Sequence, residues 1–228
     1  MIQDEIKRSL GKKAATLVEE GMLVGLGSGT TATCFIQSLI ERYREGLKCT
    51  AVSSSVASAN LARQGGIPVL EMDEVTSIDL TVDGADEVDP RFQMIKGGGA
   101  AHVREKILAS SSKQWVVIID ESKLVKTLGK AKLPVEILSF GYRATIAKIE
   151  QAGYRGELRK KGSSMVITDN GNYLYDITTP ALFFNPRVDH FRLIALPGVI
   201  DTGFFFDLPA RVLVGYKDGT LAYLKEGN

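Results

Sequence analysis

The segment GLGSGTTA, at residues 25–32, combines glycines with hydroxyl side chains in a pattern that suits an anion. Glycines let the backbone approach a ligand closely, and the first turn of a following helix offers N–H groups to a negative charge. Ser28, Thr30 and Thr31 add hydroxyl donors around Gly29. The segment therefore predicts a phosphate-binding loop, and the alternative is a tight strand–helix turn that binds nothing.

The same segment departs from the common nucleotide-binding and nucleophile motifs. The dinucleotide pattern G-x-G-x-x-G fails because Thr30 stands in place of the third glycine, and the GK[ST] ending of a P-loop is absent. The nucleophile elbow G-x-S-x-G fails because Leu26 and Thr30 flank Ser28 at the positions that need glycine. We therefore expect neither a nicotinamide cofactor nor a serine nucleophile here.

An acidic stretch, DGADEVDP, begins at Asp83 and follows an apolar segment of strand character. Asp83 and Asp86 are close enough in the chain to share a site and to influence each other's protonation. A calcium loop would need acidic residues at its positions 1, 3 and 5 and a glycine at position 6, so we predict no metal here. The alternative is a solvated acidic turn.

The segment KGGGAAHVREK, from Lys96 to Lys106, places three consecutive glycines before a predicted helix. Gly97, Gly98 and Gly99 lose much backbone freedom on folding, and a site that needs close backbone approach explains why they are there. Such a loop can donate N–H groups to an oxyanion, while Glu105 on the helix could act as a base. The alternative for Glu105 is an exposed helical residue between two basic neighbours.

Lys123 lies in a polar loop, DESK, that follows the strongly apolar segment WVVIID. It could neutralise a substrate oxygen or phosphate, or it could be an ordinary exposed lysine. The serines at 53–58 predict a helix cap, with an anion nest as the alternative. His102 and His190 have no partner at metal-ligand spacing, so we expect neither to bind a metal.

The elements that would position these residues alternate between strand and helix over the first 120 residues. Apolar runs predict strands, and amphipathic segments predict helices around them. This alternation is typical of a parallel sheet that helices cover on both faces. If the glycine loop, the acidic stretch, the triple glycine and DESK each follow a strand of that sheet, they converge on one edge. The expected strands cover 22–26, 49–52, 66–72, 78–82 and 115–120, and the expected helices cover 2–20, 31–46, a segment ending near 64, and 100–110.

The pattern changes after about residue 130. A strand at 133–138 and a helix at 144–153 precede three short stretches of strand character, and Asn170-Gly171 predicts a hairpin turn between two of them. This antiparallel α+β character predicts a second, smaller domain. Two further strands are expected around Asp218-Gly219, and by pattern alone they could join either domain.

Composition excludes several classes of protein. The chain has 228 residues, a formal net charge of +1 and 44% hydrophobic residues, which excludes disorder as its main state. The balanced charge gives no electrostatic reason to expect nucleic acid as a partner. Cys34 and Cys49 are the only cysteines, and we expect free thiols in the core. The charged N-terminal segment and the lack of a long apolar run lead us to expect a cytoplasmic protein without membrane contact.

The motifs together resemble ribose-5-phosphate isomerases of the A type, over essentially the whole chain. The glycine loop usually reads GTGST in that family and reads GSGTT here, and residues 178–192 look less typical. The motifs that carry the resemblance are GLGSGTTA, SSSVAS, VDGADEVDP, MIKGGGAAHVREKI, DESKLV, LPVEIL, TDNGNYLYDI and PGVIDTGFF.

The resemblance implies interconversion of D-ribose 5-phosphate and D-ribulose 5-phosphate through an enediolate, without metal or organic cofactor, in the non-oxidative pentose phosphate pathway. It makes Glu105 the proton-accepting base and assigns catalytic or substrate contacts to the other motif residues. These are Ser28, Gly29, Thr30, Thr31, Asp83, Gly84, Ala85, Asp86, Lys96, Gly97, Gly98, Gly99 and Lys123.

The resemblance also implies an α/β fold, with a Rossmann-like parallel-sheet large domain and a smaller ferredoxin-like α+β domain. The terminal strands would return to the large domain, so that residues 1–129 and 205–228 form it and residues 130–204 form the small one. The family forms homodimers or homotetramers. Three rivals are a non-catalytic sugar-phosphate sensor, a sister enzyme such as a sugar-phosphate deaminase or a coenzyme A transferase, and a nicotinamide oxidoreductase. A sensor would be expected to carry a DNA-binding appendage, for which the chain has no spare length. The pairing of KGGGAA with RE argues against the sister enzymes, and the broken fingerprint argues against the oxidoreductase.

Overall fold

A computed structural model describes residues 3–180, 182–208 and 210–224 of the chain. Their contacts divide the chain into two compact units. The first unit comprises Met1–Ala85, Arg104–Leu124 and Leu208–Asn228, and the second comprises Asp86–Val103 and Val125–Asp207. The chain therefore passes from one unit to the other several times.

The first unit is built on a six-stranded sheet with the order β15-β14-β6-β3-β1-β2. All neighbouring strands are parallel except β14 and β15, which are antiparallel. The apolar run at the end of β6 is buried, as expected for a strand of a parallel sheet covered on both faces. The strands are β1 (Leu23–Leu26), β2 (Thr50–Ser53), β3 (Ile78–Asp83), β6 (Ser112–Asp120), β14 (Ala210–Gly215) and β15 (Leu221–Tyr223).

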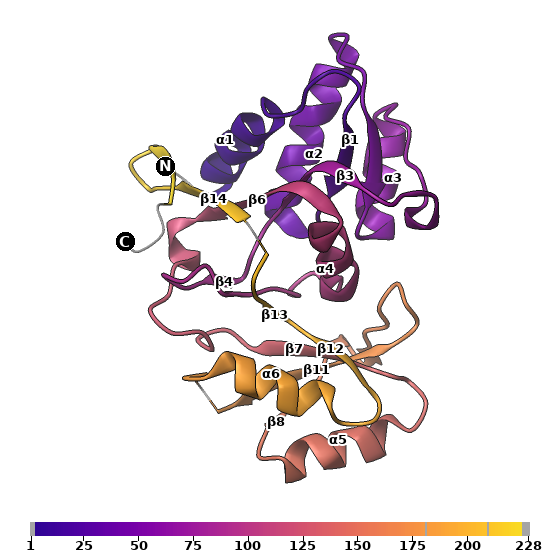
Figure 1. Cartoon of the computed structure of the whole chain (residues 1–228), viewed down its shortest axis with the longest axis vertical. Helices are drawn as coiled ribbons and strands as arrows, with labels where there is room; N and C mark the ends of the chain where they lie inside the picture. The colour runs from indigo at the N-terminus through magenta and orange to yellow at the C-terminus, as the bar shows by residue number, and fades with distance from the viewer. Residues whose placement is uncertain (1–2, 181, 209, 225–228) are drawn as a thin grey trace. The chain divides into compact units, whose positions relative to one another are not determined.

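Helices α1 (Gln3–Ala15) and α2 (Gly29–Arg44) lie side by side against this sheet (Figure 1). Their apolar stripes, which include Leu10 and Phe35, join the main core cluster of the unit. Gly11 allows the close approach, because an added Cβ would lie 2.5 Å from the carbonyl carbon of Cys34. The unit also contains α3 (Val56–Gln64), most of α4 (His102–Ser110), and the short 3-10 helices η1 (Met72–Glu74) and η2 (Glu121–Lys123).

The second unit contains an antiparallel four-stranded sheet with the order β12-β7-β11-β8. Along the chain its elements follow the β-α-β-β-α-β order of a ferredoxin-like fold. Ile149 of α5 and Leu193 of α6 join one apolar cluster with Val135 and Tyr175 of the sheet. The elements are β7 (Leu133–Ile137), α5 (Tyr142–Gln151), β8 (Arg155–Leu158), β11 (Tyr173–Thr179), α6 (Pro186–Ile194) and β12 (Val199–Thr202).

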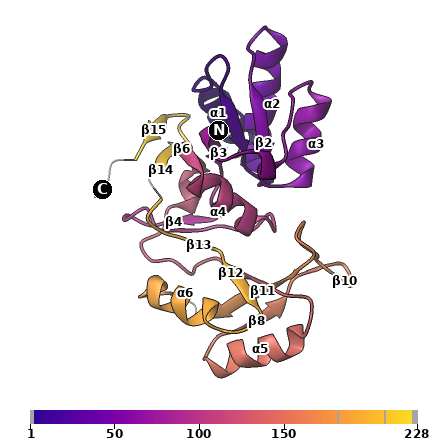
Figure 2. The ribbon, with the colours of Figure 1, turned by 45° about the vertical axis from the view of Figure 1, so that its right-hand side comes forward.

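Two smaller sheets complete the second unit. One has the order β13-β5-β4 and is antiparallel. The other is a two-stranded hairpin of β9 and β10, which extends from the larger sheet as an arm (Figure 2). Their strands are β4 (Glu87–Val88), β5 (Met94–Ile95), β13 (Phe204–Phe205), β9 (Lys160–Lys161) and β10 (Ser164–Met165).

The fold class predicted from the sequence, α/β with a parallel-sheet unit and a ferredoxin-like α+β unit, is confirmed. The terminal strands β14 and β15 join the parallel sheet. The predicted strand at 66–72 is wrong, because this segment forms only one parallel bridge, between Val69 and Ala51. Pro68 lacks the N–H group that a regular ladder would need.

The position of the triple glycine also differs from the expected one. Lys96–Gly99 follows β5, a strand of the small antiparallel sheet, and does not follow a strand of the parallel sheet. The observed units accordingly assign 86–103 to the second unit, whereas the sequence pattern places it in the large domain. The pairing of β5 with β13, more than a hundred residues later, explains the difference. The expected domain limits stay a prediction.

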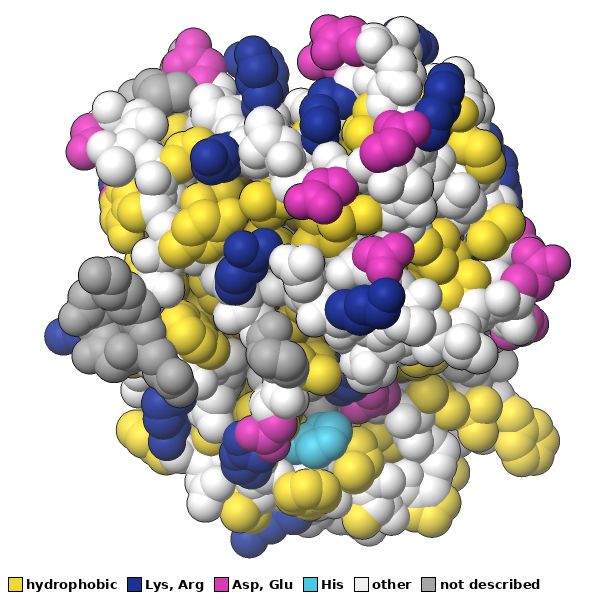
Figure 3. All heavy atoms as spheres, turned by 45° about the horizontal axis from the view of Figure 1, so that its top comes forward, with side chains coloured by type: hydrophobic (Ala, Val, Ile, Leu, Met, Phe, Trp, Pro, Cys, Tyr) yellow, Lys and Arg dark blue, Asp and Glu magenta, His cyan; other side chains and the backbone are white. Residues whose placement is uncertain are grey.

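The surface is mixed in charge. On the face drawn in Figure 3, basic and acidic side chains are interspersed and do not gather by sign, in keeping with the net charge of +1. Every helix among the described residues is too short or too polar to cross a lipid bilayer.

Candidate functional site

The first unit brings two predicted loops together where the strand order of its sheet reverses. β2 pairs with one side of β1, and β3 pairs with the other side, so the ends of β1 and β3 form a switch point of the kind at which α/β proteins bind ligands. Gly27 follows β1, and a Cβ added to it would lie 2.1 Å from Oδ1 of Asp83. The lack of a side chain at Gly27 therefore lets the two loops touch.

Asp83 is the residue that joins these loops. It ends β3 and is only 1% exposed. Its Oδ1 accepts hydrogen bonds from the backbone N–H groups of Ser28 (3.1 Å) and Gly84 (2.8 Å). Asp83 is therefore a buried and oriented carboxylate, so the alternative of a solvated acidic turn is wrong at this position. Ala85 follows, half-buried, at the end of this stretch.

Glu105 lies in the first turn of α4 and is 3% exposed, so it is not the exposed helical residue of the alternative interpretation. The hydroxyl of Ser28 donates a hydrogen bond to Oε1 of Glu105 at 2.5 Å. Ser28 thus contacts two predicted carboxylates, Asp83 through its backbone N–H and Glu105 through its side chain. A buried carboxylate held in one orientation is the arrangement that a general base requires.

The predicted phosphate loop lies at the N-terminus of α2. Ser28 is the N-cap residue, with extended backbone, and its hydroxyl makes no capping hydrogen bond to the helix. Gly29 has φ of +83°, a conformation that glycine adopts without strain. Thr30 is exposed and Thr31 is half-buried. The first turn of α2 carries no acidic residue, so no side chain of the helix itself offsets the positive end of its dipole.

The structure adds a cation that sequence reasoning missed. The Nζ of Lys7, on α1, donates to Oγ1 of Thr30 at 3.1 Å. In the sequence, Lys7 is one charged residue of an amphipathic helix, and nothing in its spacing relates it to residue 30. Only the packing of α1 beside α2 reveals that Lys7 serves the same loop.

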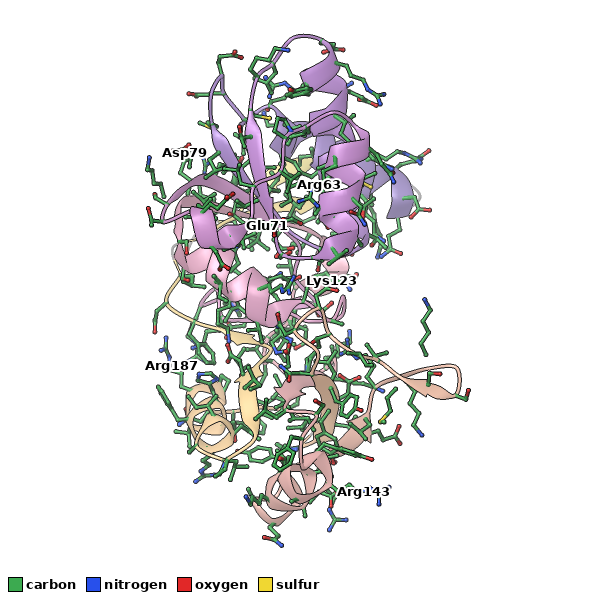
Figure 4. All side chains as sticks on the ribbon, turned by 90° about the vertical axis from the view of Figure 1, so that its right-hand side faces the viewer. Arg63, Glu71, Asp79, Lys123, Arg143 and Arg187 are labelled. Atoms are coloured by element: carbon green, nitrogen blue, oxygen red, sulfur yellow. The ribbon has the colours of Figure 1, made fainter. Side chains whose placement is uncertain are left out.

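Lys123 lies on η2, after the end of β6 (Figure 4). Asp120 begins this turn by accepting the N–H of Ser122 at 3.0 Å. Burial alone would raise the pKa of Asp120, but hydrogen bonds from Ser122 and Gln3 and the charge of Lys123 outweigh it, and the pKa lies below its ordinary value. The turn that carries Lys123 is thus anchored by an ionised carboxylate at neutral pH.

The remaining predicted residues lie in the second unit. Lys96 is 2% exposed, and its ammonium group lies 5.4 Å from the centre of the Phe205 ring, a cation–π contact. Its backbone N–H donates to the carbonyl of Gly203 at 2.8 Å. A lysine buried to this extent is not an ordinary surface residue.

The glycine segment after Lys96 is held by hydrogen bonds. Gly97 is buried with φ of +113°, and Gly98 and Gly99 are exposed. The N–H of Gly98 donates to Oδ2 of Asp86 at 2.8 Å. The second unit therefore connects Asp86, predicted from the acidic stretch, to the triple glycine.

Other predicted features have structural roles. Ser55 caps α3 by accepting the N–H of Ser58, which supports the helix-cap interpretation of that serine cluster. Nε2 of His102 lies 3.3 Å from the carbonyl of Asp201, and Nδ1 of His190 lies 2.8 Å from the hydroxyl of Thr202. Within the described ranges, no cluster of three or more His, Cys, Asp or Glu side chains could hold a metal ion.

Both cysteines are free, as expected. Cys49 is buried, as predicted for a core residue. Cys34 is only half-buried, so the prediction that it lies in the core is wrong. Burial raises the pKa of each thiol above its ordinary value, which makes both poor nucleophiles at neutral pH.

Comparison with known proteins places similar sequences in a single family. Residues 50–219 match the protein family described as ribose 5-phosphate isomerase A (phosphoriboisomerase A). The ribose-5-phosphate isomerase A of Chlamydia trachomatis serovar L2 is 50% identical, over 98% of this chain and 93% of that protein. The enzyme of the same name from Bacillus mycoides is 43% identical, over 96% of this chain and 99% of that protein.

Solved structures give the same result. The ribose 5-phosphate isomerase of Plasmodium falciparum superimposes with a TM-score of 0.94 at 33% identity, covering 99% of this chain and 100% of the other. A D-ribose-5-phosphate isomerase in complex with phospho-erythronic acid gives a TM-score of 0.92 at 36% identity, with the same coverage.

Proposed function

The chain belongs to the ribose 5-phosphate isomerase A family, and from this premise we propose which of its residues carry out the reaction. The activity is the interconversion of ribose 5-phosphate and ribulose 5-phosphate, a step of the pentose phosphate pathway. The observation that carries our assignment is the buried cluster of Ser28, Asp83 and Glu105 at the switch point of the parallel sheet.

Glu105 is the base that moves the proton between the two carbons. From the open-chain aldose it takes the proton at C2, and the electron pair of that bond forms a C1=C2 double bond while O1 gains negative charge. The product of this step is an enediolate. Glu105 then returns the proton to C1, O1 takes up a proton, and O2 loses one to become the carbonyl oxygen of the ketose. Asp83 and Asp86 are the groups to which we assign the proton exchange between O1 and O2, or ring opening.

Lys96 and the N–H groups of Gly97 and Gly99 stabilise the oxyanion, and the N–H of Gly98, which donates to Asp86, holds the segment in place. A charge that develops during a reaction is stabilised most by donors that are already fixed in place. The burial of Lys96 and the hydrogen-bonded state of the glycine segment support this role. No metal or organic cofactor is needed in this assignment, because the negative charge meets a lysine and backbone donors.

The phosphate group of the substrate binds at the N-terminus of α2. Its partners are Ser28, Gly29, Thr30 and Thr31, to which the structure adds Lys7. Lys123, Gly84 and Ala85 contact the rest of the substrate. A related isomerase was solved with phospho-erythronic acid, which supports a site for a phosphorylated sugar chain. The carboxylate of that acid is planar and negative, as an enediolate is.

We also propose that the protein is a cytoplasmic homodimer or homotetramer. The free thiols Cys34 and Cys49 favour a reducing compartment. Exposed aromatic side chains such as Phe184, which is 81% exposed, favour self-association.

A turnover assay with ribose 5-phosphate in the presence of EDTA tests the proposed function. We expect Glu105→Gln to lower kcat by about 10²–10⁴-fold, the contribution of a general base, while substrate still binds. The matched control is Glu71→Gln, which neutralises an exposed glutamate of the same unit that pairs with Arg63 (Figure 4). Wild-type turnover by a folded Glu105→Gln protein would remove Glu105 from the mechanism.

A further inference from the structure

We infer that Arg159 is a positioning residue for the reaction and sets the orientation of the Gly97–Gly99 peptide groups. Sequence reasoning assigned Arg159 only to a stretch of strand character, and the proposed function gives it no role. The inference rests on that proposed function, because it concerns the glycine segment to which we assign oxyanion stabilisation. All the contacts that carry it lie within the second unit.

The guanidinium of Arg159 joins the glycine segment to the central sheet. On one side, its Nε and Nη2 donate to the two carboxylate oxygens of Asp176, at 2.8 Å and 2.5 Å. On the other side, its Nη1 donates to the carbonyls of Gly97 (2.7 Å) and Gly98 (3.1 Å). The planar geometry of the guanidinium fixes the relative directions of these bonds, which a lysine could not reproduce.

The support for this contact is rigid. Asp176 is 6% exposed and lies on β11, which has a strand on either side. The side chain of Arg159 is only 17% exposed, and the backbone N–H of Arg159 donates to the carbonyl of Leu174 at 2.8 Å. A buried carboxylate paired in this bidentate way holds the guanidinium in one place.

Both polar groups of the Gly97–Gly98 peptide, its C=O and its N–H, form hydrogen bonds. Its carbonyl accepts from Arg159 and from the backbone N–H of Ala100, and its N–H donates to Asp86. Rotation of this peptide would break all three hydrogen bonds. The next peptide has its carbonyl, that of Gly98, on Arg159, so in a trans peptide the N–H of Gly99 points the opposite way. Arg159 therefore determines the direction in which the segment presents N–H groups.

Glycine is required here for the same geometry. Gly97 has φ of +113°, and a Cβ at Gly98 would lie 2.8 Å from Oδ1 of Asp86. Glycines that adopt these conformations are also free to adopt others, and the turn has only one local hydrogen bond, from the N–H of Ala100 to the carbonyl of Gly97 at 3.0 Å. Arg159 and Asp86 add the hydrogen bonds that hold the segment from outside.

Steady-state kinetics of Arg159→Met test the inference. We expect kcat to fall about 10–100-fold with KM changed less than about 3-fold, because misplaced donors weaken transition-state stabilisation more than ground-state binding. Arg159→Lys keeps the positive charge but lacks the planar guanidinium with its several N–H donors. We expect it to recover little of the fall in kcat. The matched control is Arg187→Met, which removes another bidentate arginine–aspartate pair of the same unit, with Asp207 (Figure 4). Its kcat should stay within about 2-fold of wild type.

Rescue of kcat by added guanidinium distinguishes a positioning role of Arg159 from a general loss of protein stability in the variant. Arg159 lines a cavity of about 650 Å³, which gives a small cation access to the vacated space in Arg159→Ala. Added guanidinium, at concentrations that do not unfold the protein, should restore kcat at least about 10-fold, and equal concentrations of sodium chloride should not. A folded Arg159→Met protein with wild-type kcat, or an Arg159→Ala loss that guanidinium cannot rescue, would overturn the inference.

The variant Lys96→Met distinguishes failure of the positioning role of Arg159 from failure of the proposed function. If Lys96→Met is inactive while Arg159→Met is fully active, only the positioning role is wrong. If both variants turn over at the wild-type rate, the assignment of oxyanion stabilisation to this segment is wrong as well.

Discussion

A carboxylate that carries a proton from one carbon to its neighbour has to reach both carbons and keep the same orientation throughout. Glu105, to which we assign this role, is held by burial and by a hydrogen bond of 2.5 Å from the hydroxyl of Ser28. Asp83 is fixed in a different way, by two backbone N–H groups on one oxygen. The two buried carboxylates of this cluster therefore accept from different kinds of donor, a hydroxyl and backbone N–H groups, and we assign them distinct tasks.

At the residue scale, Lys7 tests the phosphate site. We expect Lys7→Met to raise KM about 10-fold with little change in kcat, because a charge-assisted contact near the phosphate contributes to binding throughout the reaction. Thr31→Ala should also act mainly on KM. The control Lys12→Met removes an exposed lysine from the last turn of the same helix. An unchanged KM in both Lys7→Met and Thr31→Ala would move the phosphate site away from this loop.

The sequence patterns name candidate residues but say little about their surroundings. For Glu105 they leave a base and an exposed helical residue as alternatives; its burial excludes the second, and its role as the base stays a proposal. Lys7 and Arg159 could not be found from local patterns. Each acts on a loop that is distant in the chain, and a lone basic residue in an ordinary helix or strand carries no signal of its partner.

At the scale of elements, the contact between α6 and the start of β8 has a pH-dependent component. Tyr154, which precedes β8, is 3% exposed, and its hydroxyl donates to Oδ1 of Asp189 on α6 at 2.7 Å. Burial, aided by Asp189, raises the pKa of Tyr154 to about 12. In the unfolded chain the same hydroxyl ionises near the ordinary value of about 10.

This difference predicts how stability changes in alkali. As pH rises from about 10 to about 12, the unfolded chain releases the Tyr154 proton while the folded protein retains it, so the free energy of unfolding falls. Below about pH 10 the contribution is fully present. Urea unfolding of wild type and Tyr154→Phe should show their difference shrinking by about 1 kcal/mol between about pH 9 and about pH 11. A difference that is constant with pH would refute the proposed origin of the shift.

Helices and strands with a strong periodic or apolar pattern could be predicted from the sequence. Short strands that form only because a distant strand pairs with them could not. The strands β1, β3 and β6 were predicted to within a few residues. The segment 66–72 has the apolar content of a strand, but Pro68 and its position beside an outer strand leave it with a single bridge. The short strand β5 exists because β4 and β13 pair with it, and a two-residue strand has no pattern to detect.

At the scale of the whole molecule, the residues to which we assign the reaction belong to two compact units. Ser28, Asp83 and Glu105 belong to the first, whereas Lys96 and Asp86 belong to the second. The boundary falls within the acidic stretch, between Ala85 and Asp86. Local sequence patterns cannot reveal such a division, because it is defined by which distant segments pack together.

The exposed aromatic side chains of the second unit lead to a prediction about assembly. Phe184 and Phe191 are 81% and 64% exposed, and burying such surface against a second copy would be favourable. We expect sedimentation equilibrium of the active enzyme to give two or four times the chain mass of 24.8 kDa. A fully active species of 24.8 kDa at micromolar concentration would contradict the proposed assembly.

In the proposed mechanism, the carboxylate of Glu105 itself carries the proton between C2 and C1. The most direct measurement follows deuterium by NMR after mixing the enzyme with ribose 5-phosphate labelled at C2. We expect wild type to deliver part of the label to C1 of ribulose 5-phosphate and to lose the rest to water, because one group removes and returns it. In Glu105→Gln, transfer and loss should both fall by the same factor as kcat. Loss of label from C2 at the wild-type rate in that variant would show that another group takes the proton.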